Sequence, residues 1–487
     1  MAEAWLGIDV GTQGARAVLI DGSGGVLGQG SRPLTSVRAP GRHEQDPRDW
    51  TDAVAGACRQ ALYGAPGYRV AALAVCATSG TITVVDGRGR PLAPGLMYDD
   101  VRAGAQAEAA NRAGAELWSR LGYRVQPSWA LPKLLWLLAQ RPALPPDARL
   151  RHQSDVVTGW LAGNPVATDW SHALKSGYDL LELRWPAELL DALGVPQPLL
   201  PDVVAPGQVI GTVGVAAAAE TGLPPGTPIV AGMTDGCASQ LAAGVVAAGS
   251  WNCVLGTTLV FKGVTPALVR DPEGAVYSHR AADGSWLPGG ASSVGAGYLA
   301  HAFGDADHER LDALARSVES TAPVLYPLVG RGERFPFVAP QAESFALGEI
   351  SGTAEHYAAA LQGVAFIERL GFDYLSHLGM PVDTVTLTGG GSASRYWCQV
   401  QADVLGRPVS VTRHADAAFG MAVLASRRDS RQAGELARTA AKPVVIEPRA
   451  HAAGAYTGRY LELVDELTRR AWLPETIAET ARERFTS

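Results

Sequence analysis

Apolar positions at the start of the chain follow the periods of strands and helices in turn. The runs AWLGIDV and ARAVLID flank a Gly-Thr-Gln-Gly turn, which predicts a hairpin. Residues 49–64 have helical spacing, and Asp49 is the expected cap of that helix. Continuous apolar runs at 70–78 and 81–86 predict two further strands. This alternation indicates an α/β protein.

The remaining pattern predicts further helices, strands and one long connection. Helical spacing recurs at 102–114, 128–140, 353–379 and 418–426, and in an amphipathic segment near 455–485. Thr353 is the expected cap of the helix at 353–379. Pro132 falls in the first turn of the second of these helices, where proline is tolerated. The proline-rich stretch 200–228 is predicted to be a surface connection that carries a short helix. Residues 382–406 predict a strand, a glycine loop and a helix. The small residues of 418–426 indicate a helix packed closely against a neighbour.

One arrangement of strands occurs twice along the chain. Residues 250–264 repeat the apolar strand, Gly-Thr turn and returning strand of the N-terminus, about 245 residues further on. We therefore predict two similarly built α/β domains with a ligand cleft between them. The expected segments are a first domain at 1–245, a second at 246–440 and a helical extension at 441–487.

Composition narrows the possible functions. The chain has 487 residues, of which 47% are hydrophobic and 18% charged, and this balance is typical of a globular protein. The net charge of -7 without a long basic run argues against a nucleic-acid partner. Only four residues are lysines, and no Gly-Lys-Ser/Thr sequence occurs, so a P-loop is excluded. A nucleotide would need another binding device.

Cysteine usage and the N-terminus point to a cytoplasmic protein. The five cysteines are scattered and form neither a C-x-x-C pair nor a zinc pattern, as expected for buried thiols in a reducing compartment. The first residues lack the features of a signal peptide, and no run approaches the length of a membrane span. We expect no membrane partner, and either a monomer or a homodimer.

Asp9 ends an apolar run immediately before the Gly-Thr-Gln-Gly turn. Glycine lets the backbone approach a phosphate, and successive turn N–H groups can form an anion-binding concavity. A carboxylate there would repel phosphate unless a cation lay between them, and Mg²⁺ needs only one or two protein carboxylates. Asp9 is thus either a magnesium partner in a phosphate loop or a plain turn residue.

Three further motifs have both a chemical and a structural interpretation. The turn Gly256–Thr257–Thr258 is either a second phosphate clamp or a polar hairpin turn. Asp235 begins a small-residue helix, so it is a candidate N-cap, a candidate general base, or both. The glycines at 389–391 either let a nucleobase or ribose lie on the backbone or form a flexible surface turn.

Together these motifs resemble a known family. Five segments occur in its order: GIDVGTQGAR, HEQDPRDW, MYDDVR, GMTDGCASQLAAG and LTGGGSASRYWCQVQAD. The chain resembles the FGGY carbohydrate kinases, which share the actin-like ATPase (ribonuclease H-like) fold. The resemblance extends to about residue 430 and implies transfer of phosphate from ATP, with Mg²⁺, to a sugar or polyol hydroxyl.

The resemblance also implies roles for individual residues. Asp235 would be the catalytic base and would contact the sugar, and Asp9 would serve as the metal partner. The residues implied in ATP binding are Asp9, Gly11, Thr12, Gln13, Gly256, Thr257, Thr258, Gly389, Gly390, Gly391 and Ser394.

Substrate preference depends on two local departures from the xylulokinase pattern. Thr78–Ser79–Gly80–Thr81 replaces the usual Met-His pair, and Tyr98–Asp99–Asp100 replaces Trp-Asn-Asp. This combination resembles the branch of D-ribulose kinases, so D-ribulose is the first expectation and D-xylulose or another sugar or polyol the alternative. Ser79 would hydrogen-bond a sugar hydroxyl, or would be a satisfied turn serine. Asp100 would bind a sugar hydroxyl, or would only pair with Arg102.

Two other classes of protein remain as alternatives. A non-kinase actin-like ATPase or sugar sensor would keep the phosphate loops without needing a base at Asp235. A glycoside hydrolase would use Asp9 and Asp235 as its two carboxylates. It would leave the glycine-threonine turns without a role.

Overall fold

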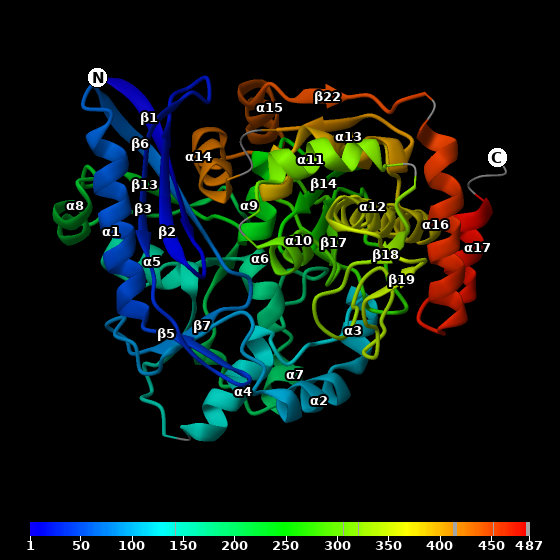
Figure 1. Cartoon of the computed structure of the whole chain (residues 1–487). Coiled ribbons are helices and arrows are strands. Elements are labelled where there is room, and N and C mark those ends of the chain that lie inside the picture. The colour runs from blue at the N-terminus through cyan, green and yellow to red at the C-terminus, as the bar shows by residue number, and fades with distance from the viewer. Residues whose placement is uncertain (142, 305, 320, 413–415, 451, 484–487) are drawn as a thin grey trace. The chain divides into compact units, whose positions relative to one another are not determined.

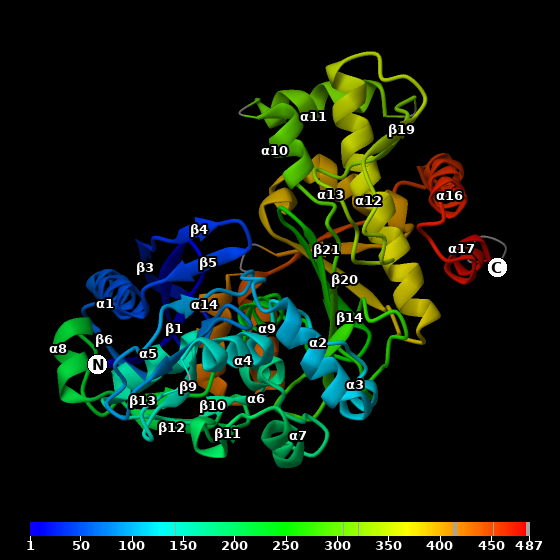
Figure 2. The same cartoon turned by 90° about the horizontal axis from the view of Figure 1, so that it is seen from below.

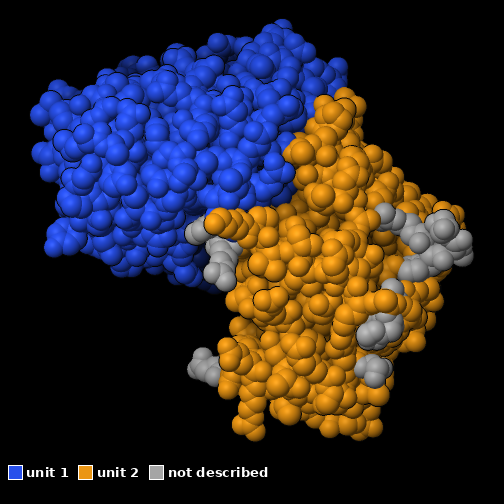
Figure 3. Space-filling model, turned by 90° about the horizontal axis from the view of Figure 1, so that it is seen from above, with its two compact units in different colours: residues 1–246, 279–287, 414–441 blue, residues 247–278, 288–413, 442–487 orange. Residues whose placement is uncertain are grey.

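The structure is a computed structural model that describes residues 1–141, 143–304, 306–319, 321–412, 416–450 and 452–483. The chain forms two compact units, coloured separately in Figure 3. Unit 1 contains residues 1–246, 279–287 and 414–441, and unit 2 contains residues 247–278, 288–413 and 442–487. Among the described residues, no helix is both long and apolar enough to cross a membrane.

A six-stranded sheet with the order β12–β13–β6–β1–β2–β3 forms the centre of unit 1. Its strands are β1 (Ala2–Val10), β2 (Gly14–Ile20), β3 (Val26–Pro33), β6 (Tyr68–Ala77), β12 (Val209–Thr212) and β13 (Pro228–Val230). The predicted N-terminal hairpin is confirmed, because β1 and β2 pair antiparallel. Strand β6 runs parallel to β1 on its other side. β1 is therefore a central strand, as its buried apolar residues require.

Helix α1 (Pro47–Tyr63) covers this sheet beside β3, as Figure 1 shows. The helix was predicted, but the expectation that Asp49 caps it is wrong. Asp46 is the N-cap and accepts a hydrogen bond from the Arg48 backbone N–H. Pro47 takes the first helical position, where its fixed φ favours a helix and no N–H is needed.

A smaller sheet of five short strands has the order β4–β5–β8–β7–β9. Its strands are β4 (Val37–Ala39), β5 (Arg42–Gln45), β8 (Gly95–Leu96), β7 (Ile82–Val85) and β9 (Arg149–His152). The other α-helices of unit 1 are α2 (Gly104–Ala113), α3 (Ala115–Leu121), α4 (Ala130–Gln140), α5 (Gln153–Ala162), α6 (Trp170–Ala173), α7 (Ala187–Ala192), α8 (Val215–Thr221), α9 (Asp235–Ala242), α14 (Ala417–Arg427) and α15 (Ser430–Ala441). The helix predicted around Pro132 is confirmed as α4.

The connection predicted over 200–228 contains more regular structure than expected. It carries β11 (Val203–Val204), which pairs with β10 (Thr168–Asp169), and the edge strand β12 of the large sheet. The predicted short helix is confirmed as α8. Strands this short and partly exposed lack a strong apolar pattern, so only their sheet partners reveal them.

Helix α14 packs directly on β1, which confirms the close approach that its small residues indicate. A Cβ added at Gly7 would lie 1.8 Å from the Ala418 carbonyl oxygen and 2.3 Å from the Ala422 nitrogen. On the other face, a Cβ at Gly420 would lie 2.1 Å from the Ala238 oxygen in α9. Glycine is thus required wherever the backbones of β1, α14 and α9 approach one another.

The second large sheet has seven strands in the order β16–β17–β15–β14–β20–β21–β22. Figure 2 labels three of them, β14, β20 and β21. The seven strands are β14 (Ser250–Leu255), β15 (Leu259–Gly263), β16 (Tyr277–Arg280), β17 (Trp286–Ala291), β20 (Thr384–Thr388), β21 (Val409–Val411) and β22 (Val444–Ile446). Two more, β18 (Val324–Tyr326) and β19 (Phe345–Leu347), pair with each other. The α-helices of unit 2 are α10 (Gly297–Phe303), α11 (His308–Ser317), α12 (Thr353–His377), α13 (Arg395–Leu405), α16 (Ala452–Arg469) and α17 (Glu475–Glu483).

Two boundary predictions in unit 2 need correction. Thr353 begins α12, but the N-cap is Gly352, which precedes it. The helix predicted near 455–485 is two helices, α16 and α17, while residues 484 and 485 lie outside the described residues. Trp472 and Leu473 lie between these helices and are buried in the core. The apolar pattern therefore continues through the turn and does not show that the helix ends there.

The predicted internal repeat is present in the strand pairings of both large sheets. In each, a central strand pairs antiparallel with its successor across a Gly-Thr turn and parallel with a later strand on its other side. The central strands are β1 and β14. Of the described residues, 416–441 belong to unit 1, and the expected division into segments 1–245, 246–440 and 441–487 stays a prediction.

Candidate functional site

Sheet register brings two predicted site residues of unit 1 to one edge. Asp9 lies near the end of β1, opposite Cys76 in the parallel strand β6. Ala77, the last residue of β6, forms a parallel bridge with Thr234, and Asp235 follows as the first residue of α9. The carboxyl ends of parallel strands meet at the same edge of a sheet, and ligands of open α/β sheets bind there.

The carboxylates at this edge influence one another. Partial burial, the charge of Asp235 and the charge of Asp416 raise the pKa of Asp9 to about 7, while Arg16 opposes the rise. Asp416 is the N-cap of α14, which packs on β1. A carboxyl group such as Asp9, whose ionisation is opposed by neighbouring carboxylates, is suited to binding a cation. Among the described residues, no group of three or more histidine, cysteine, aspartate or glutamate side chains is placed to hold a metal ion.

A cleft of about 930 Å³ opens at the β1–β2 turn. The Gly11 N–H donates to the Gly14 carbonyl at 3.0 Å, which closes the turn. The residues that line this cleft are Asp9, Gly11, Thr12, Gln13, Gly14, Ala15, Arg16, Ser31, Arg32, Pro33, Leu34, Ser36, Arg38 and Tyr98. The four residues expected in the first phosphate loop therefore surround one opening in unit 1.

Asp235 is held by the turn before α9. The N-cap of this helix is Thr234, so the interpretation of Asp235 as the cap is wrong, and its carboxylate accepts instead from the Gly236 N–H at 2.8 Å. The Thr234 N–H donates to Ser171 Oγ at 2.9 Å, and Ser171 Oγ donates to Asp169 at 2.5 Å. Asp169 and Ser171 thus position the backbone from which Asp235 projects.

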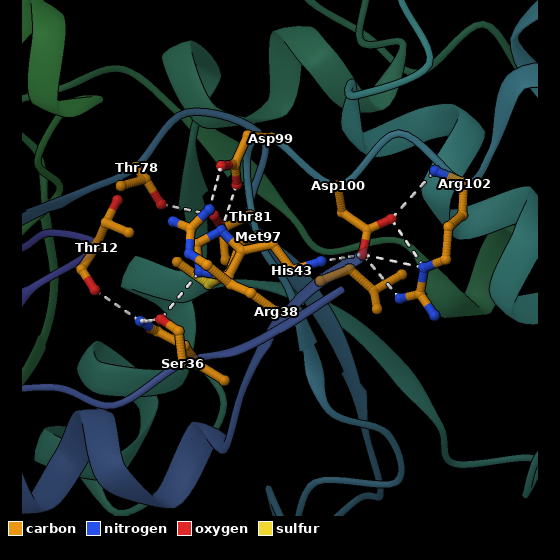
Figure 4. A network of polar contacts seen from close by, with 12 residues as sticks. Thr12, Ser36, Arg38, His43, Thr78, Thr81, Met97, Asp99, Asp100 and Arg102 are labelled. Carbon is orange, nitrogen blue, oxygen red and sulfur yellow. Dashed lines mark hydrogen bonds and ion pairs between the residues drawn. The ribbon is translucent and has the colours of Figure 1, made fainter. Parts of the chain in front are cut away.

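A polar network connects the cleft to Asp99 (Figure 4). Asp99 accepts from Arg38 at 3.2 Å and from Nδ1 of buried His43. His43 Nε2 accepts from Ser36 Oγ at 2.9 Å. The Gln45 side chain donates to Ser36 Oγ at 2.9 Å and to the Thr12 carbonyl at 2.7 Å. Asp99 is therefore engaged by protein groups, through the positive charge of Arg38 and a hydrogen bond from His43.

Asp100 is engaged by protein groups on both of its oxygens. The Arg102 guanidinium donates to them at 2.7–3.1 Å, and the His43 backbone N–H donates at 3.0 Å (Figure 4). The Arg102 hydrogen bond and the other donors hold the pKa of Asp100 below its ordinary value against the effect of burial. The expected pairing with Arg102 is thus present, and a contact between Asp100 and a sugar remains a prediction.

Ser79 differs from Asp100 because its hydroxyl is buried and has no protein partner among the described residues. The Ser79 carbonyl accepts from Lys175 Nζ at 3.2 Å. Neighbouring Thr78 is satisfied, since its hydroxyl bonds Thr81 at 2.6 Å and Gln153 at 2.7 Å. A buried hydroxyl without a partner costs free energy, so a ligand group that completes its hydrogen bonds would be favoured.

Unit 2 brings the other two glycine motifs together. The turn Gly256–Thr258 follows Leu255 at the end of β14. Gly389 and Gly391 pack on Leu255, because a Cβ at either glycine would lie within 3 Å of that residue. Gly389 also has φ = +85°, which favours glycine. The two predicted nucleotide loops are therefore neighbours in unit 2.

Ser394 has a structural role that the sequence analysis did not include. It is the N-cap of α13, its Oγ accepts from the Trp397 N–H at 2.9 Å, and it donates to Asp312 at 2.7 Å. Gly390 has open space at the position of a Cβ. Their contact with adenosine remains a prediction.

Sequence reasoning missed Tyr98, Asp416 and Ser171 as parts of the site. Tyr98 lines the cleft, and a hydrogen bond joins its side chain to that of Thr12. Burial and the charges of Asp99 and Asp235 raise the Tyr98 pKa. Tyr98 was inside a recognised motif and could have been found. Asp416 and Ser171 carry no local signal, because only long-range packing brings them near residues 9 and 235.

The fold is that of an α/β kinase of the actin-like ATPase class, since solved kinases share the architecture. One is the xyloylose kinase from Brucella ovis, which is 25% identical, has a TM-score of 0.86, and is matched over 96% of this chain and 99% of its own. The TM-score and coverage show that the fold extends over nearly the whole chain.

Family models give the assignment within that class. The N-terminal and C-terminal domains of the FGGY family of carbohydrate kinases match residues 4–242 and 251–428, so the chain belongs to this family. The xylulose kinase of Escherichia coli strain K12 is 30% identical over 451 residues, which are 86% of this chain and 89% of that protein. The glycerol kinase of Thermus brockianus is 31% identical over 436 residues, which are 83% of this chain and 85% of that protein.

Proposed function

We propose that this carbohydrate kinase transfers the γ-phosphoryl group of ATP to a hydroxyl of a ketopentose, with D-xylulose as the first substrate to test. The motifs at Ser79 and Tyr98 favoured D-ribulose in the sequence analysis. The relatives include xylulose kinases from Escherichia coli and Streptomyces rubiginosus and support the D-xylulose alternative better. D-ribulose therefore becomes the comparison substrate.

The observation that carries the proposal is the convergence of Asp9, Thr12 and Asp235 within unit 1. Asp235 accepts the proton of the sugar hydroxyl as that oxygen bonds to the γ-phosphorus and ADP leaves. Ser171 and Asp169 keep the Asp235 turn in place. Positioning and charge stabilisation supply most of the acceleration in such a transfer.

Asp9 fits a magnesium partner. Its pKa of about 7 arises from burial and from two neighbouring carboxylates, so a divalent cation would restore its full charge. Asp9 would supply a hard carboxylate oxygen of the kind that Mg²⁺ prefers, and water and phosphate oxygens would make up the other ligands. When bound, Mg²⁺ supplies charge neutralisation of the phosphates.

ATP would be held by the glycine motifs. In unit 1, the Gly11–Gln13 turn offers backbone N–H groups and the Thr12 hydroxyl to phosphate oxygens. In unit 2, Gly256–Thr258 and Gly389–Gly391 lie beside each other and offer a second set of donors and a flat backbone surface. Unit 1 would thus contact the phosphates, and unit 2 both the phosphates and the nucleoside.

Ser79 would contact the sugar. Its buried, unpartnered hydroxyl can donate to or accept from a substrate hydroxyl, and an epimer that fails to do so leaves it unpaired. Asp99 would act indirectly, because Arg38 and His43 already occupy its carboxylate.

The test is coupled ADP release with Mg-ATP over D-xylulose, D-ribulose, other pentuloses, glycerol and gluconate. We expect D-xylulose to give the highest kcat/KM and ADP release far above the rate without sugar. A preference for D-ribulose would overturn the substrate assignment. ADP release unaffected by every sugar would overturn the kinase proposal.

A further inference from the structure

A second, larger cavity of about 1200 Å³ lies in unit 1. Its walls come from β4, the turn after β7, the first turn of α1, and helices α5 and α8. Strand β4 separates it from the cleft at the β1–β2 turn. Val37 lines the larger cavity, whereas its neighbours Ser36 and Arg38 line the cleft. Successive side chains of a strand point to opposite faces, so the two cavities are distinct.

Arginine dominates the charge of this second cavity. Among the described residues that line it are six arginines: Arg42, Arg48, Arg88, Arg90, Arg141 and Arg151. The four carboxylates that line it are Glu44, Asp46, Asp155 and Glu220. Glu44 pairs with Arg42 and Arg102, and Asp46 with Arg48, while Arg90 pairs with Asp86. Arg88, Arg141 and Arg151 then stand against Asp155 and Glu220. The remaining charge is therefore positive.

Arg151 is the unusual member of this set. It lies in β9, is only 7% exposed, and forms no ion pair with a carboxylate within the described parts of the chain. One of its terminal nitrogens donates to the Val166 carbonyl at 3.2 Å. A guanidinium carries five N–H donors in a planar fork, so most of its donors remain available at the cavity wall.

Burying the Arg151 charge without an ion pair is unfavourable. Burial lowers the pKa of Arg151, and the Asp155 charge only partly opposes that effect. Asp155 itself is committed to His152, from whose backbone N–H and Nδ1 it accepts at 2.9 and 2.7 Å. An anion in the cavity would supply the missing acceptors and opposite charge.

We propose that this cavity binds the phosphate group of a small phosphorylated metabolite, with Arg151 as the buried anchor. Arg88, exposed on the turn after β7, and Arg141 lie on the same cavity and add charge toward a phosphate dianion. An arginine guanidinium can donate two parallel hydrogen bonds to two oxygens of one phosphate. The cavity also has room for a sugar attached to that phosphate. The assignment does not depend on the proposed kinase substrate.

Gln45 gives this site a direct connection to the β1–β2 turn. It lines the second cavity, and its side chain donates to the Thr12 carbonyl at 2.7 Å. The Trp50 indole N–H fixes the Gln45 amide by donating to its oxygen at 2.7 Å. A ligand that fills the cavity therefore contacts a side chain that holds Thr12.

The test measures binding of ribose 5-phosphate, inorganic phosphate, ribose and gluconate to the full-length protein by calorimetry. Trp160 lines the cavity, so indole fluorescence gives a second readout. We expect ribose 5-phosphate to bind, ribose not to bind, and gluconate to bind at least tenfold more weakly than the phosphate ester. Binding of inorganic phosphate alone at equal strength would identify the free ion rather than an ester as the ligand and overturn the metabolite assignment.

Substitutions at the cavity wall test whether ribose 5-phosphate binds in this cavity. Arg151→Gln and Arg88→Gln are each expected to weaken ribose 5-phosphate binding about tenfold or more. Arg149→Gln is the matched control, because Arg149 is on the same strand but does not line the cavity. Arg88 is exposed, so its variant tests the site even if Arg151→Gln fails to fold.

Two results would overturn the proposal. One is the absence of ribose 5-phosphate binding by the unaltered protein. The other is unchanged binding by folded Arg88→Gln protein and by folded Arg151→Gln protein, which would place the ligand elsewhere, such as the β1–β2 cleft. Sugar-dependent ADP release by the same unaltered protein is measured separately, so either proposal can fail alone.

Discussion

Asp9 shows how position alters the chemistry of a single carboxylate. An ordinary aspartate ionises near pH 4, whereas burial and the charges of Asp235 and Asp416 raise the pKa of Asp9 to about 7. The three carboxylates come from β1 and the first turns of α9 and α14. They meet because β1, α9 and α14 pack together with glycine at the contacts. The sequence indicated chemistry at Asp9 and Asp235, but the contribution of Asp416 required the fold.

Replacing Asp235 by asparagine tests the base at the residue scale. We expect kcat for sugar phosphorylation to fall by about 10²–10⁴, the usual contribution of a general base, because an amide cannot accept the hydroxyl proton. Binding of ATP, measured by calorimetry, should change little. Asp52→Asn on the exposed face of α1 is the control. Retained turnover in Asp235→Asn would exclude the base assignment.

Replacing Ser79 by alanine tests the sugar contact. The Ser79 hydroxyl has no protein partner in the described structure, so its loss removes no hydrogen bond from the free enzyme. We expect KM for the sugar to rise about tenfold, as for one hydrogen bond to a substrate hydroxyl, with KM for ATP unchanged. Steady-state kinetics with each substrate varied in turn measure both. Equal effects on the two KM values would contradict a sugar contact, and Ser23→Ala in an exposed turn is the control.

At the scale of elements, the same arrangement of three strands occurs twice in the chain. β1 with β2, and β14 with β15, each form a hairpin across a Gly-Thr turn and pair in parallel with a later strand. The hairpins could be predicted because alternating apolar residues and glycine turns are local signals. The short strands β11 and β12 could not, since their pairing depends on partners distant in the sequence.

Gly7→Ala tests the contact between β1 and α14. The added Cβ would lie 1.8 Å from the Ala418 carbonyl oxygen, and neither backbone can move away without disturbing the sheet. We expect the free energy of unfolding to fall by about 1–3 kcal/mol or more. Denaturant unfolding followed by circular dichroism measures it. Gly67→Ala is the control, because no atom lies within 4 Å of its Cβ position, and equal stability of both variants would refute the close approach.

At the scale of the whole molecule, the order of segments in the chain differs from their order in space. Residues 416–441 belong to unit 1 although they follow most of unit 2 in the chain, and α14 packs on β1. Residues 442–487 belong to unit 2. A division of the sequence into consecutive segments cannot represent this path, because linear patterns do not reveal which sheet a later helix covers.

Glu368 in α12 makes overall stability depend on pH. Burial raises the pKa of this carboxyl to about 8, and the Cys253 thiol beside it opposes the rise only in part. The unfolded carboxyl returns to about 4.5, so the unfolded chain binds fewer protons between pH 4.5 and 8. The contribution of Glu368 to the free energy of unfolding is therefore fully present below pH 4.5 and decreases as the pH rises toward 8.

Glu368→Gln removes that dependence. We expect the variant to be more stable than the unaltered protein at pH 8, by on the order of a few kcal/mol, with the difference shrinking toward pH 5. Thermal and denaturant unfolding across this pH range measures the change. Glu479→Gln, exposed on α17, should follow the unaltered protein at every pH. A difference that is constant with pH would contradict burial of the Glu368 charge.

The sequence by itself determined the α/β class, the two Gly-Thr hairpins, the glycine loop before α13 and the kinase family, because these depend on local periodicity and on motifs of fixed order. Only the tertiary structure decided the return of α14 to unit 1, the meeting of Asp9 with Asp235 and Asp416, the unpaired hydroxyl of Ser79 and the arginine-lined cavity at Arg151. Each of these depends on contacts between residues far apart in the chain. Burial at those contacts changes pKa values and leaves polar groups without partners, and neither effect is visible in a linear pattern.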